Sequence, residues 1–337
     1  MTAAPSGAIE TLTIDGLSVS FTVAAAGWPR RKRQVGTLAA VSDVSFTLAP
    51  GEGLGVVGES GCGKSTLARA IAGLAQPTSG VIRLGNQTLS SRRSRSTSRR
   101  IQMVFQDPAS SLNPRMTVRS MLTEILRVHE IVDRSQVGQR LEELMRMVEL
   151  PPGVLDQRPR ALSGGQRQRV GIARALAPLP ELIILDEAIA SLDVSVQAAV
   201  LQLLRTLQAE LGLAMIFISH DLSAVRGLCA RVAVMYLGRI VEVGPVEEVL
   251  ARPAHPYTRA LIAAEPSLDE TRLPGAAGLA GEPPSAINLP TGCAFRNRCP
   301  VAQDSCADSV PTLNPDAHHD QACFFPIDTV VPAASQA

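Results

Sequence analysis

The stretch GESGCGKST, residues 58–66, decides the fold of this chain because it joins two segments of different character. Before it stands LGVVG, residues 54–58, a short apolar run that predicts a buried strand. After it, KSTLARAIAGL, residues 64–74, is typical of a helix. The stretch matches G-x-x-x-x-G-K-[ST], which forms a phosphate-binding loop when it follows a strand and opens a helix. The alternative is a glycine-rich turn that only caps a helix, and the order of strand, loop and helix argues against it.

Each residue type in this loop has a physical reason to face a phosphate. Gly58, Gly61 and Gly63 let the backbone curl so that several N–H groups face one anion, and the helix N-terminus adds partial positive charge. The chain has only two lysines among its 32 basic residues. Lys64 is therefore expected to act as a compact point charge on the terminal phosphates. Ser65 can be a ligand for Mg²⁺. The same nucleotide-binding loop includes Glu59, Ser60, Cys62 and Thr66.

Length and composition limit the class of protein. The chain has 337 residues, of which 45% are hydrophobic, so it can bury a core in one large or two ordinary domains. A net charge of +1 gives no overall attraction to nucleic acid. The first residues, MTAAPSGAIETLTIDG, lack the pattern of a signal peptide, and no apolar run reaches the length of a spanning helix. We therefore expect a cytosolic protein whose six cysteines are reduced or metal-bound.

Short apolar runs alternate with helical segments along much of the chain, which predicts a largely parallel sheet covered by helices. The expected strands are 44–50, 54–58, 182–186 and 213–219, with a strand pair over 231–244, and an amphipathic helix is expected over 194–211. Strands disappear between about 107 and 178, where 116–131 and 136–150 favour helices, so this part is expected to be an inserted helical subdomain. The basic run SSRRSRSTSRR, residues 90–100, favours a solvated loop over a nucleic-acid patch because it contains no aromatic residue.

Polar residues follow two other predicted strands. LIILDE, residues 182–187, ends in Asp186, which suits a Mg²⁺ ligand, and Glu187, which could polarise a water for attack on a γ-phosphate. An acidic pair in this position is more often a helix cap. His220 follows the strand 213–219, although a lone histidine there is more often structural. The interpretation rests on convergence, because ligands bind at the carboxyl ends of strands in open α/β sheets.

LSGGQRQRVGIARAL, residues 162–176, is the most specific segment. Ser163 and Gln166 fit a capping box at the start of a helix. Beyond this local reading, LSGGQ resembles the signature of ATP-binding cassette (ABC) ATPases. Gln106 resembles the Q-loop glutamine of that family, and SLD, residues 191–193, resembles its D-loop. His220 also stands at the family's spacing. The resemblance implies catalytic roles for Glu187, His220 and Gln106, and Gln106 as a further Mg²⁺ ligand. Phe21 stands where the family places an aromatic that stacks on adenine, although an ordinary strand aromatic is an alternative.

A narrower resemblance covers nearly the whole chain. GESGCGKSTLARAI, FQDPASSLNPRMTV and HPYTRALIAAEP are similar to the ATPase subunits of oligopeptide and dipeptide importers, especially to the second of their two paralogous ATPases. One departure is Ala188, where the family usually has proline, and we expect only a local backbone effect. The resemblance implies a P-loop ABC ATPase core with an antiparallel β subdomain and an inserted helical subdomain. We expect the ATPase core over residues 1–264 and an irregular C-terminal extension over 265–337.

The resemblance also implies the partners and the activity. The chain would hydrolyse ATP with Mg²⁺ to drive peptide uptake, as a peripheral subunit on the cytoplasmic face of the cell membrane. It would pair head to tail with the paralogous ATPase, bind two permease subunits and receive solute from an extracytoplasmic binding protein. The signature and D-loop would then act in the partner's ATP site, through Ser163, Gly164, Gly165, Gln166 and Asp193. Nickel or glutathione uptake is a related alternative, and a soluble ABC ATPase acting on nucleic acid is disfavoured because the chain has no heptad arms or second cassette.

Four cysteines near the end of the chain have the spacing C-x₅-C-x₆-C-x₁₆-C: Cys293, Cys299, Cys306 and Cys323. This spacing lacks the tight pairs of structural zinc sites and suits the four-cysteine ligation of a 4Fe–4S cluster. The resemblance points the same way, since some members of the importer family bind such a cluster there. Zinc, with His318 or His319 as a substitute ligand, is the second alternative, and buried cysteines without metal are the third.

Overall fold

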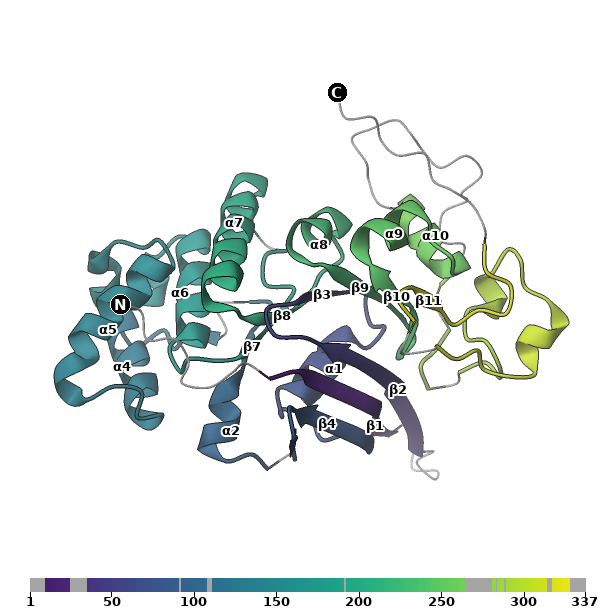
Figure 1. The fold of residues 1–337 in the computed structure, drawn as a ribbon, viewed down its shortest axis with the longest axis horizontal. Helices are drawn as coiled ribbons and strands as arrows, with labels where there is room; N and C mark the ends of the chain where they lie inside the picture. Colours follow the sequence, from purple (N-terminus) through teal and green to yellow (C-terminus); the bar gives the residue numbers. More distant parts are fainter. Residues whose placement is uncertain are drawn as a thin grey trace, which may run out of the picture.

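The computed structural model describes residues 10–24, 35–90, 92–107, 111–190, 192–264, 281–282, 284–287, 289–313 and 317–327. Two sheets organise these residues (Figure 1). The first is antiparallel, in the order β2-β1-β4-β5, and the second is a seven-stranded sheet in the order β11-β10-β9-β3-β8-β7-β6. Most of the linker expected after Pro266, and Ser191 of the D-loop, lie outside the described residues.

The antiparallel sheet contains β1 (Leu12–Ala24), β2 (Val35–Leu48), β4 (Ser79–Leu84) and β5 (Gln87–Thr88). The seven-stranded sheet contains β3 (Gly53–Val57), β6 (Ile101–Val104), β7 (Leu182–Asp186), β8 (Ala214–Ile218), β9 (Arg231–Tyr236), β10 (Arg239–Pro245) and β11 (Asp320–Gln321). Strands β6, β7, β8, β3 and β9 are parallel, so their carboxyl ends lie at one edge. The expected strands and the strand pair over 231–244 are confirmed.

The α-helices are α1 (Lys64–Ile71), α2 (Arg95–Arg100), α4 (Val118–Val128), α5 (Val137–Met147), α6 (Gly164–Leu176), α7 (Val194–Leu211), α8 (Leu222–Leu228), α9 (Val246–Ala251) and α10 (Pro256–Ala264). Short 3₁₀ turns cover Arg134–Gln136, Pro152–Asp156, Pro159–Ala161, Arg296–Arg298 and Asp304–Ala307. Local signals set several ends: the Thr117 hydroxyl accepts from the Ser120 N–H at the start of α4, and Gly212, with φ +65°, ends α7. The helices expected at 116–131, 136–150 and 194–211 are confirmed.

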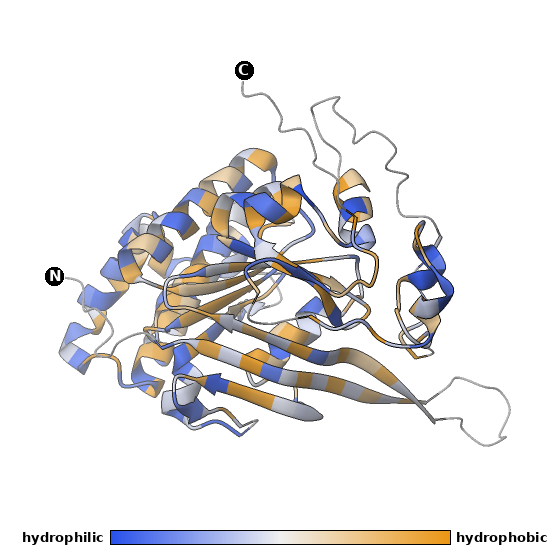
Figure 2. Ribbon diagram, turned by 45° about the vertical axis from the view of Figure 1, so that its right-hand side comes forward, coloured by the Kyte–Doolittle hydropathy of each residue, from blue (hydrophilic) through white to orange (hydrophobic). Residues whose placement is uncertain are grey.

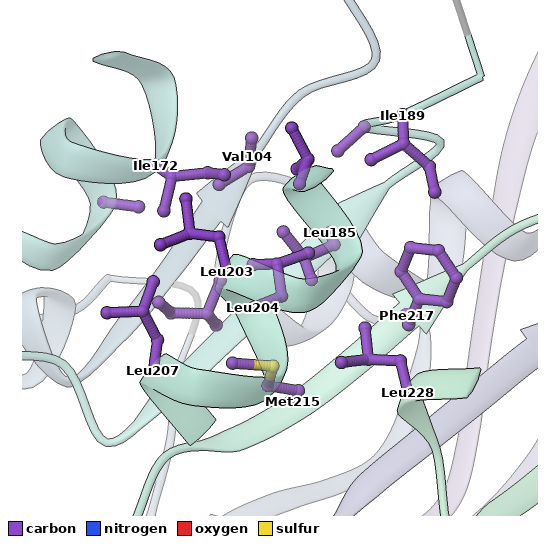
Figure 3. Close-up of a cluster of buried hydrophobic side chains, with 14 of the residues drawn as sticks. Val104, Ile172, Leu185, Ile189, Leu203, Leu204, Leu207, Met215, Phe217 and Leu228 are labelled. Atoms are coloured by element: carbon purple, nitrogen blue, oxygen red, sulfur yellow. The ribbon is translucent and has the colours of Figure 1, made fainter. Parts of the chain in front are cut away.

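Hydrophobic packing occurs on both faces of the parallel strands, which explains why they are continuous apolar runs. On one face Leu185, Met215 and Phe217 pack in one cluster with Leu203 and Leu204 of α7 and Leu228 of α8 (Figure 3). On the other face, alternate residues of the same strands join α1 and the antiparallel sheet. The covering helices carry orange stripes among blue residues in Figure 2. Each fully buried Leu or Phe side chain contributes about 1.5–3 kcal/mol relative to leaving it in water.

The basic run 90–100 corrects one expectation. Its second half is α2 and not a loop, because the Ser94 hydroxyl accepts from the Thr97 N–H and caps the helix. Arg100 turns inward to form ion pairs with Glu10 and Glu181. The run therefore connects the antiparallel sheet to the strand pair β6 and β7, and part of its charge is neutralised within the fold.

Candidate functional site

The loop between β3 and α1 is shaped by glycines that no other residue could replace without strain. Gly58 has φ +149° and Gly63 has φ +110°, in the region that favours glycine. A Cβ atom at Gly63 would lie 2.1 Å from the carbonyl oxygen of Ala40, and one at Gly58 would lie 2.1 Å from that of Met235. The loop is thus curled and also pressed against β2 and β9.

Lys64 lies under this loop and is 4% exposed. Its Nζ donates to the carbonyl oxygens of Gly58, at 2.7 Å, and Glu59, at 2.9 Å. These bonds hold the first turn of the loop while the ammonium group borders the pocket that the loop encloses. A buried ammonium with two carbonyl partners keeps a positive charge available for an incoming anion.

The carboxyl end of β7 brings Asp186 to the first turn of α1. Asp186 Oδ1 accepts a hydrogen bond from the Ser65 hydroxyl at 2.8 Å. Burial raises the pKa of Asp186, and the charge of Glu187 adds to this effect. A carboxylate and a hydroxyl beside a phosphate loop are oxygen donors of the type that Mg²⁺ prefers. The two residues therefore fit a magnesium site.

Glu187 follows Asp186 in a strained conformation, with φ +46°. Its N–H donates to the carbonyl oxygen of Ile218 at 3.0 Å, which ties the turn to β8. Its carboxylate accepts from Gln106 Nε2 at 2.7 Å. The side chain expected to polarise the water and the Q-loop glutamine are thus in direct contact.

One pocket joins Lys64, Ser65, Gln106 and Glu187, whereas Asp186 lies behind Ser65 and is not part of its lining. It is lined by Phe21, Leu38, Ala39, Ala40, Ser60, Gly61, Cys62, Gly63, Lys64, Ser65, Thr66, Gln106, Glu187, Leu237, Gly238 and Ala286. Phe21 is 43% exposed, which leaves a ring face open to a ligand. His220 lies after β8 and is exposed, but it does not line the pocket. Sequence reasoning missed Ala40, Leu237 and Gly238 because packing of β2 and of the β9–β10 turn brings them there, with no local motif.

The start of α6 forms a second pocket. Ser163 and Gln166 make the expected capping box: the Ser163 hydroxyl accepts from the Gln166 N–H, and Gln166 Oε1 accepts from the Ser163 N–H. The lining residues are Glu149, Leu150, Pro151, Ser163, Gly164, Gly165, Gln166, Arg169, Leu192, Asp193 and Val196. No residue is shared with the phosphate-loop pocket. The signature segment and the phosphate loop of one chain therefore line separate pockets.

Comparison with known proteins places these features in a family. The family described as "ABC transporter" matches residues 41–190, and "Oligopeptide/dipeptide transporter, C-terminal region" matches residues 241–306. The chain is 51% identical, over 90% of its length and 86% of the relative's, to a probable peptide ABC transporter ATP-binding protein, y4tS, of Sinorhizobium fredii. The chain belongs to the ABC transporter ATPases. It is also 49% identical to the oligopeptide transport ATP-binding protein OppF of Escherichia coli, covering 86% of this chain and 88% of OppF.

Solved structures of ABC ATPases share the fold. The structure of cbiO1 from Clostridium perfringens, part of the ABC transporter complex cbiONQ, has a TM-score of 0.60 and 27% identity, over 72% of this chain and 90% of that one. A dimeric post-hydrolysis state of the ATP-binding cassette MJ0796, bound to ADP and Pi, has a TM-score of 0.59 and 25% identity, over 70% and 98%. The expected ABC ATPase fold is confirmed. None of the described helices is long and apolar enough to cross a membrane.

Four of the six cysteines of this ABC ATPase lie around one small pocket. Cys293, Cys299, Cys306 and Cys323 all contribute to its lining, together with Phe295 and His255. All four are free thiols, and burial raises the pKa of three of them, that of Cys323 to about 11. Within the described part of the chain, no group of three or more His, Cys, Asp or Glu residues is arranged to hold a metal ion. The structure thus gathers the cysteines without supporting a formed metal centre.

The histidines offered as substitute zinc ligands do not line this pocket. His319 Nε2 is instead 2.8 Å from Glu242 Oε1 on β10, and His318 is mostly exposed. Cys62 lies in the phosphate loop and Cys229 at the end of α8, both away from the four-cysteine pocket.

Proposed function

We propose that this ABC ATPase powers the import of oligopeptides or dipeptides. The observation that carries the proposal is the pairing of a complete nucleotide pocket with a C-terminal region of the oligopeptide/dipeptide transporter type. Relatives at about half identity over most of the chain are named as peptide import ATP-binding proteins. The chain would work on the cytoplasmic face of the membrane with a paralogous ATPase, two permeases and an extracytoplasmic solute-binding protein.

Within the pocket, the roles follow from the contacts. Lys64 and the backbone N–H groups of the loop would bind the phosphates, and Phe21 would stack on the adenine. Ser65 and Asp186 would hold Mg²⁺, which neutralises charge on the phosphates when bound. Glu187 would accept a proton from the attacking water while Gln106 orients its carboxylate. His220 would need to move toward the γ-phosphate from its exposed position.

The separate pocket at α6 supports a head-to-tail pair. Its helix N-terminus presents free N–H groups that favour an anion, yet this chain's own phosphate loop does not reach it. Ser163, Gly165 and Asp193 would therefore complete the ATP site of the partner subunit. The helical segment 107–178 would contact the permeases and transmit closure of the pair.

We infer a division into an ATPase core, residues 1–264, and a C-terminal extension, residues 265–337, that carries the four cysteines. We further propose that these cysteines hold a 4Fe–4S cluster with a structural or regulatory role, since all four line one pocket. Chemical analysis of anaerobically purified protein should find iron and sulfide in cluster stoichiometry. One zinc per chain, or four reactive thiols without metal, would overturn this assignment.

Transport by the assembled complex tests the peptide assignment. The chain, its paralogue, both permeases and the binding protein should be reconstituted in proteoliposomes with ATP and Mg²⁺. We expect ATP-dependent accumulation of labelled oligopeptides or dipeptides, and none with a non-hydrolysable ATP analogue. ATP hydrolysis that is stimulated by nickel or glutathione, and not by peptides, would contradict the assignment.

A further inference from the structure

Arg298, in the C-terminal extension, reaches across the fold to the phosphate loop. Its guanidinium makes two hydrogen bonds to the Glu59 carboxylate, from Nη1 to Oε2 at 2.7 Å and from Nη2 to Oε1 at 2.9 Å. The two residues are 239 positions apart, and the Arg298 side chain is only 5% exposed. This is the parallel two-bond geometry that arginine makes with carboxylates and that lysine cannot reproduce.

Glu59 is the residue after Gly58 in the phosphate loop, and its backbone is held as firmly as its side chain. Its N–H donates to the Tyr257 hydroxyl at 2.8 Å, and its carbonyl oxygen accepts from Lys64 Nζ at 2.9 Å. With the Arg298 pair, Glu59 is fixed from α10, from the loop itself and from the extension. The position of Ser60 and Gly61, which line the nucleotide pocket, depends on this anchor.

The charge of Glu59 gives the pair a second role. A carboxylate one residue from the pocket lining would repel the phosphates of a bound nucleotide if it were free to turn inward. Pairing with Arg298 neutralises this charge and holds the carboxylate toward the extension. Glu59 is accordingly absent from the residues that line the pocket.

Packing keeps Arg298 in place. The turn Arg296–Arg298 follows Phe295, whose ring packs against Tyr236 and Tyr257 with centroid distances of 5.3 and 5.4 Å. The Arg298 guanidinium lies 5.9 Å from the centroid of the Tyr236 ring. Tyr236 directly precedes Leu237 and Gly238 of the nucleotide pocket, so the same cluster supports the pocket from a second side.

We propose that Arg298 is a positioning residue for the phosphate loop, through which the C-terminal extension sets the affinity of the nucleotide site. The inference rests on the proposed ATP site. Cys293 and Cys299 bracket the turn that carries Arg298, so a change in the conformation of the four-cysteine segment would move the side chain that holds Glu59. Nucleotide affinity thereby reports whether the extension is correctly folded.

Nucleotide titration of the full-length chain tests the proposal, with Arg298→Met as the variant and Arg296→Met as its matched control. Arg296 lies in the same turn, but its guanidinium bonds the Thr291 hydroxyl, at 2.9 Å, and not Glu59. We expect Arg298→Met to weaken binding of a fluorescent ATP analogue by about 10-fold, because it leaves the Glu59 charge unpaired. Arg296→Met should stay within about twofold of the wild type. Equal affinity for the Arg298 variant and the wild type would overturn the proposal.

A double variant distinguishes a positioning role of Arg298 from a general effect of Arg298 on the stability of the fold. If Arg298 acts by controlling Glu59, then Glu59→Gln should make the loss of Arg298 nearly silent, and the double variant should bind ATP within about twofold of Glu59→Gln alone. A merely structural role predicts the full 10-fold loss in both backgrounds. In the assembled ATPase, Arg298→Met should raise the KM for ATP more than it lowers kcat, because Glu187 and Gln106 keep their contact.

Two further variants distinguish failure of the positioning role from failure of the proposed ATP site. Arg298→Lys retains the charge without the two-bond geometry, so it should give an intermediate affinity even if Arg298→Met fails to fold. Lys64→Ala tests the phosphate site itself and should abolish ATP binding. Normal ATP binding by Lys64→Ala would refute the proposed ATP site. If Lys64→Ala loses ATP binding while both Arg298 variants bind ATP like the wild type, only the positioning role is refuted.

Discussion

At the scale of single residues, the site depends on a few side chains held by strained or buried backbone. Glu187 adopts φ +46°, which costs free energy for a residue with a Cβ atom. The bond from its N–H to Ile218 and the contact with Gln106 keep it there. The carboxylate is thus aimed by its neighbours before any nucleotide arrives.

Glu187→Gln should leave ATP binding intact and lower turnover by about 10²- to 10⁴-fold, because the amide cannot accept a proton from water. Phosphate capture depends on Lys64 and the loop, which the substitution does not touch. The measurement is ATP hydrolysis by the assembled complex, at this subunit's site alone, beside nucleotide titration of the isolated chain. Retention of more than half of the rate would show that another group activates the water.

Residue types in contiguous motifs could be predicted from the sequence, whereas their distant supports could not. Ser65 and Asp186 were expected to share a metal, and their hydroxyl and carboxylate do meet. Arg298 and Tyr257 hold Glu59, yet nothing in their local sequence indicates this, because the contact arises when α10 and the extension dock beside β9. Phe21 was found because the family resemblance, and not periodicity, pointed to it.

At the scale of elements, α6 presents its N-terminus away from its own phosphate loop. The capping box satisfies the N–H groups of Ser163 and Gln166, and the remaining groups of the first turn face the second pocket. This end of α6 is suited to an anion that another chain supplies.

Ser163→Arg should therefore impair hydrolysis in the partner's site and leave this subunit's own nucleotide affinity nearly unchanged. A bulky cation at the helix start blocks close approach of the partner's γ-phosphate, and loss of the cap costs about 1 kcal/mol of stability. Site-specific hydrolysis in the heterodimer and nucleotide titration of the isolated subunit measure the two effects. Loss of ATP binding by the isolated variant, with normal hydrolysis in the dimer, would contradict the trans arrangement.

Helices with a clear hydrophobic period were easier to predict than short helices that depend on a capping side chain. The stripe of Val200, Leu203 and Leu207 identified α7 from the sequence, since burial on one face requires it. Helix α2 was missed because six residues give no periodic signal, and its existence depends on the Ser94 cap and on the ion pairs of Arg100. The basic residues of this segment are also typical of a solvated loop, which is why the sequence favoured a loop here.

At the scale of the whole molecule, the extension is joined to the ATPase core through a buried carboxylate. Glu242 on β10 is 0% exposed and accepts from the N–H groups of Ala254 and His255, and from His319. His255 is also buried, and its Nδ1 accepts from the Tyr257 N–H. Desolvation lowers the pKa of His255 to about 4, although the charge of Glu242 opposes the shift.

The lowered pKa of His255 predicts that the folded chain loses stability in mild acid. The unfolded chain takes up a proton near pH 6.5, whereas His255 in the folded chain stays neutral until about pH 4. The contribution of neutral His255 to the free energy of unfolding is therefore complete above pH 6.5. This contribution falls as the pH decreases toward 4, by at most about 3 kcal/mol. Thermal unfolding between pH 8 and pH 5 should show a shallower pH dependence for His255→Asn, which keeps an acceptor for the Tyr257 N–H. Parallel curves for the two proteins would mean that His255 titrates normally.

The place of strand β11 in the sequence affects the order in which the seven-stranded sheet can form during synthesis. Asp320 and Gln321 pair with Val243 and Glu242 of β10, so the outermost strand of the seven-stranded sheet is synthesised well after the strand beside it. Until then the nascent core presents the edge of β10 and a carboxylate without His319. Exposed strand edges recruit other chains. A chain released before residue 320 is thus expected to aggregate, and pairing of β11 with β10 is the step that ends this exposure.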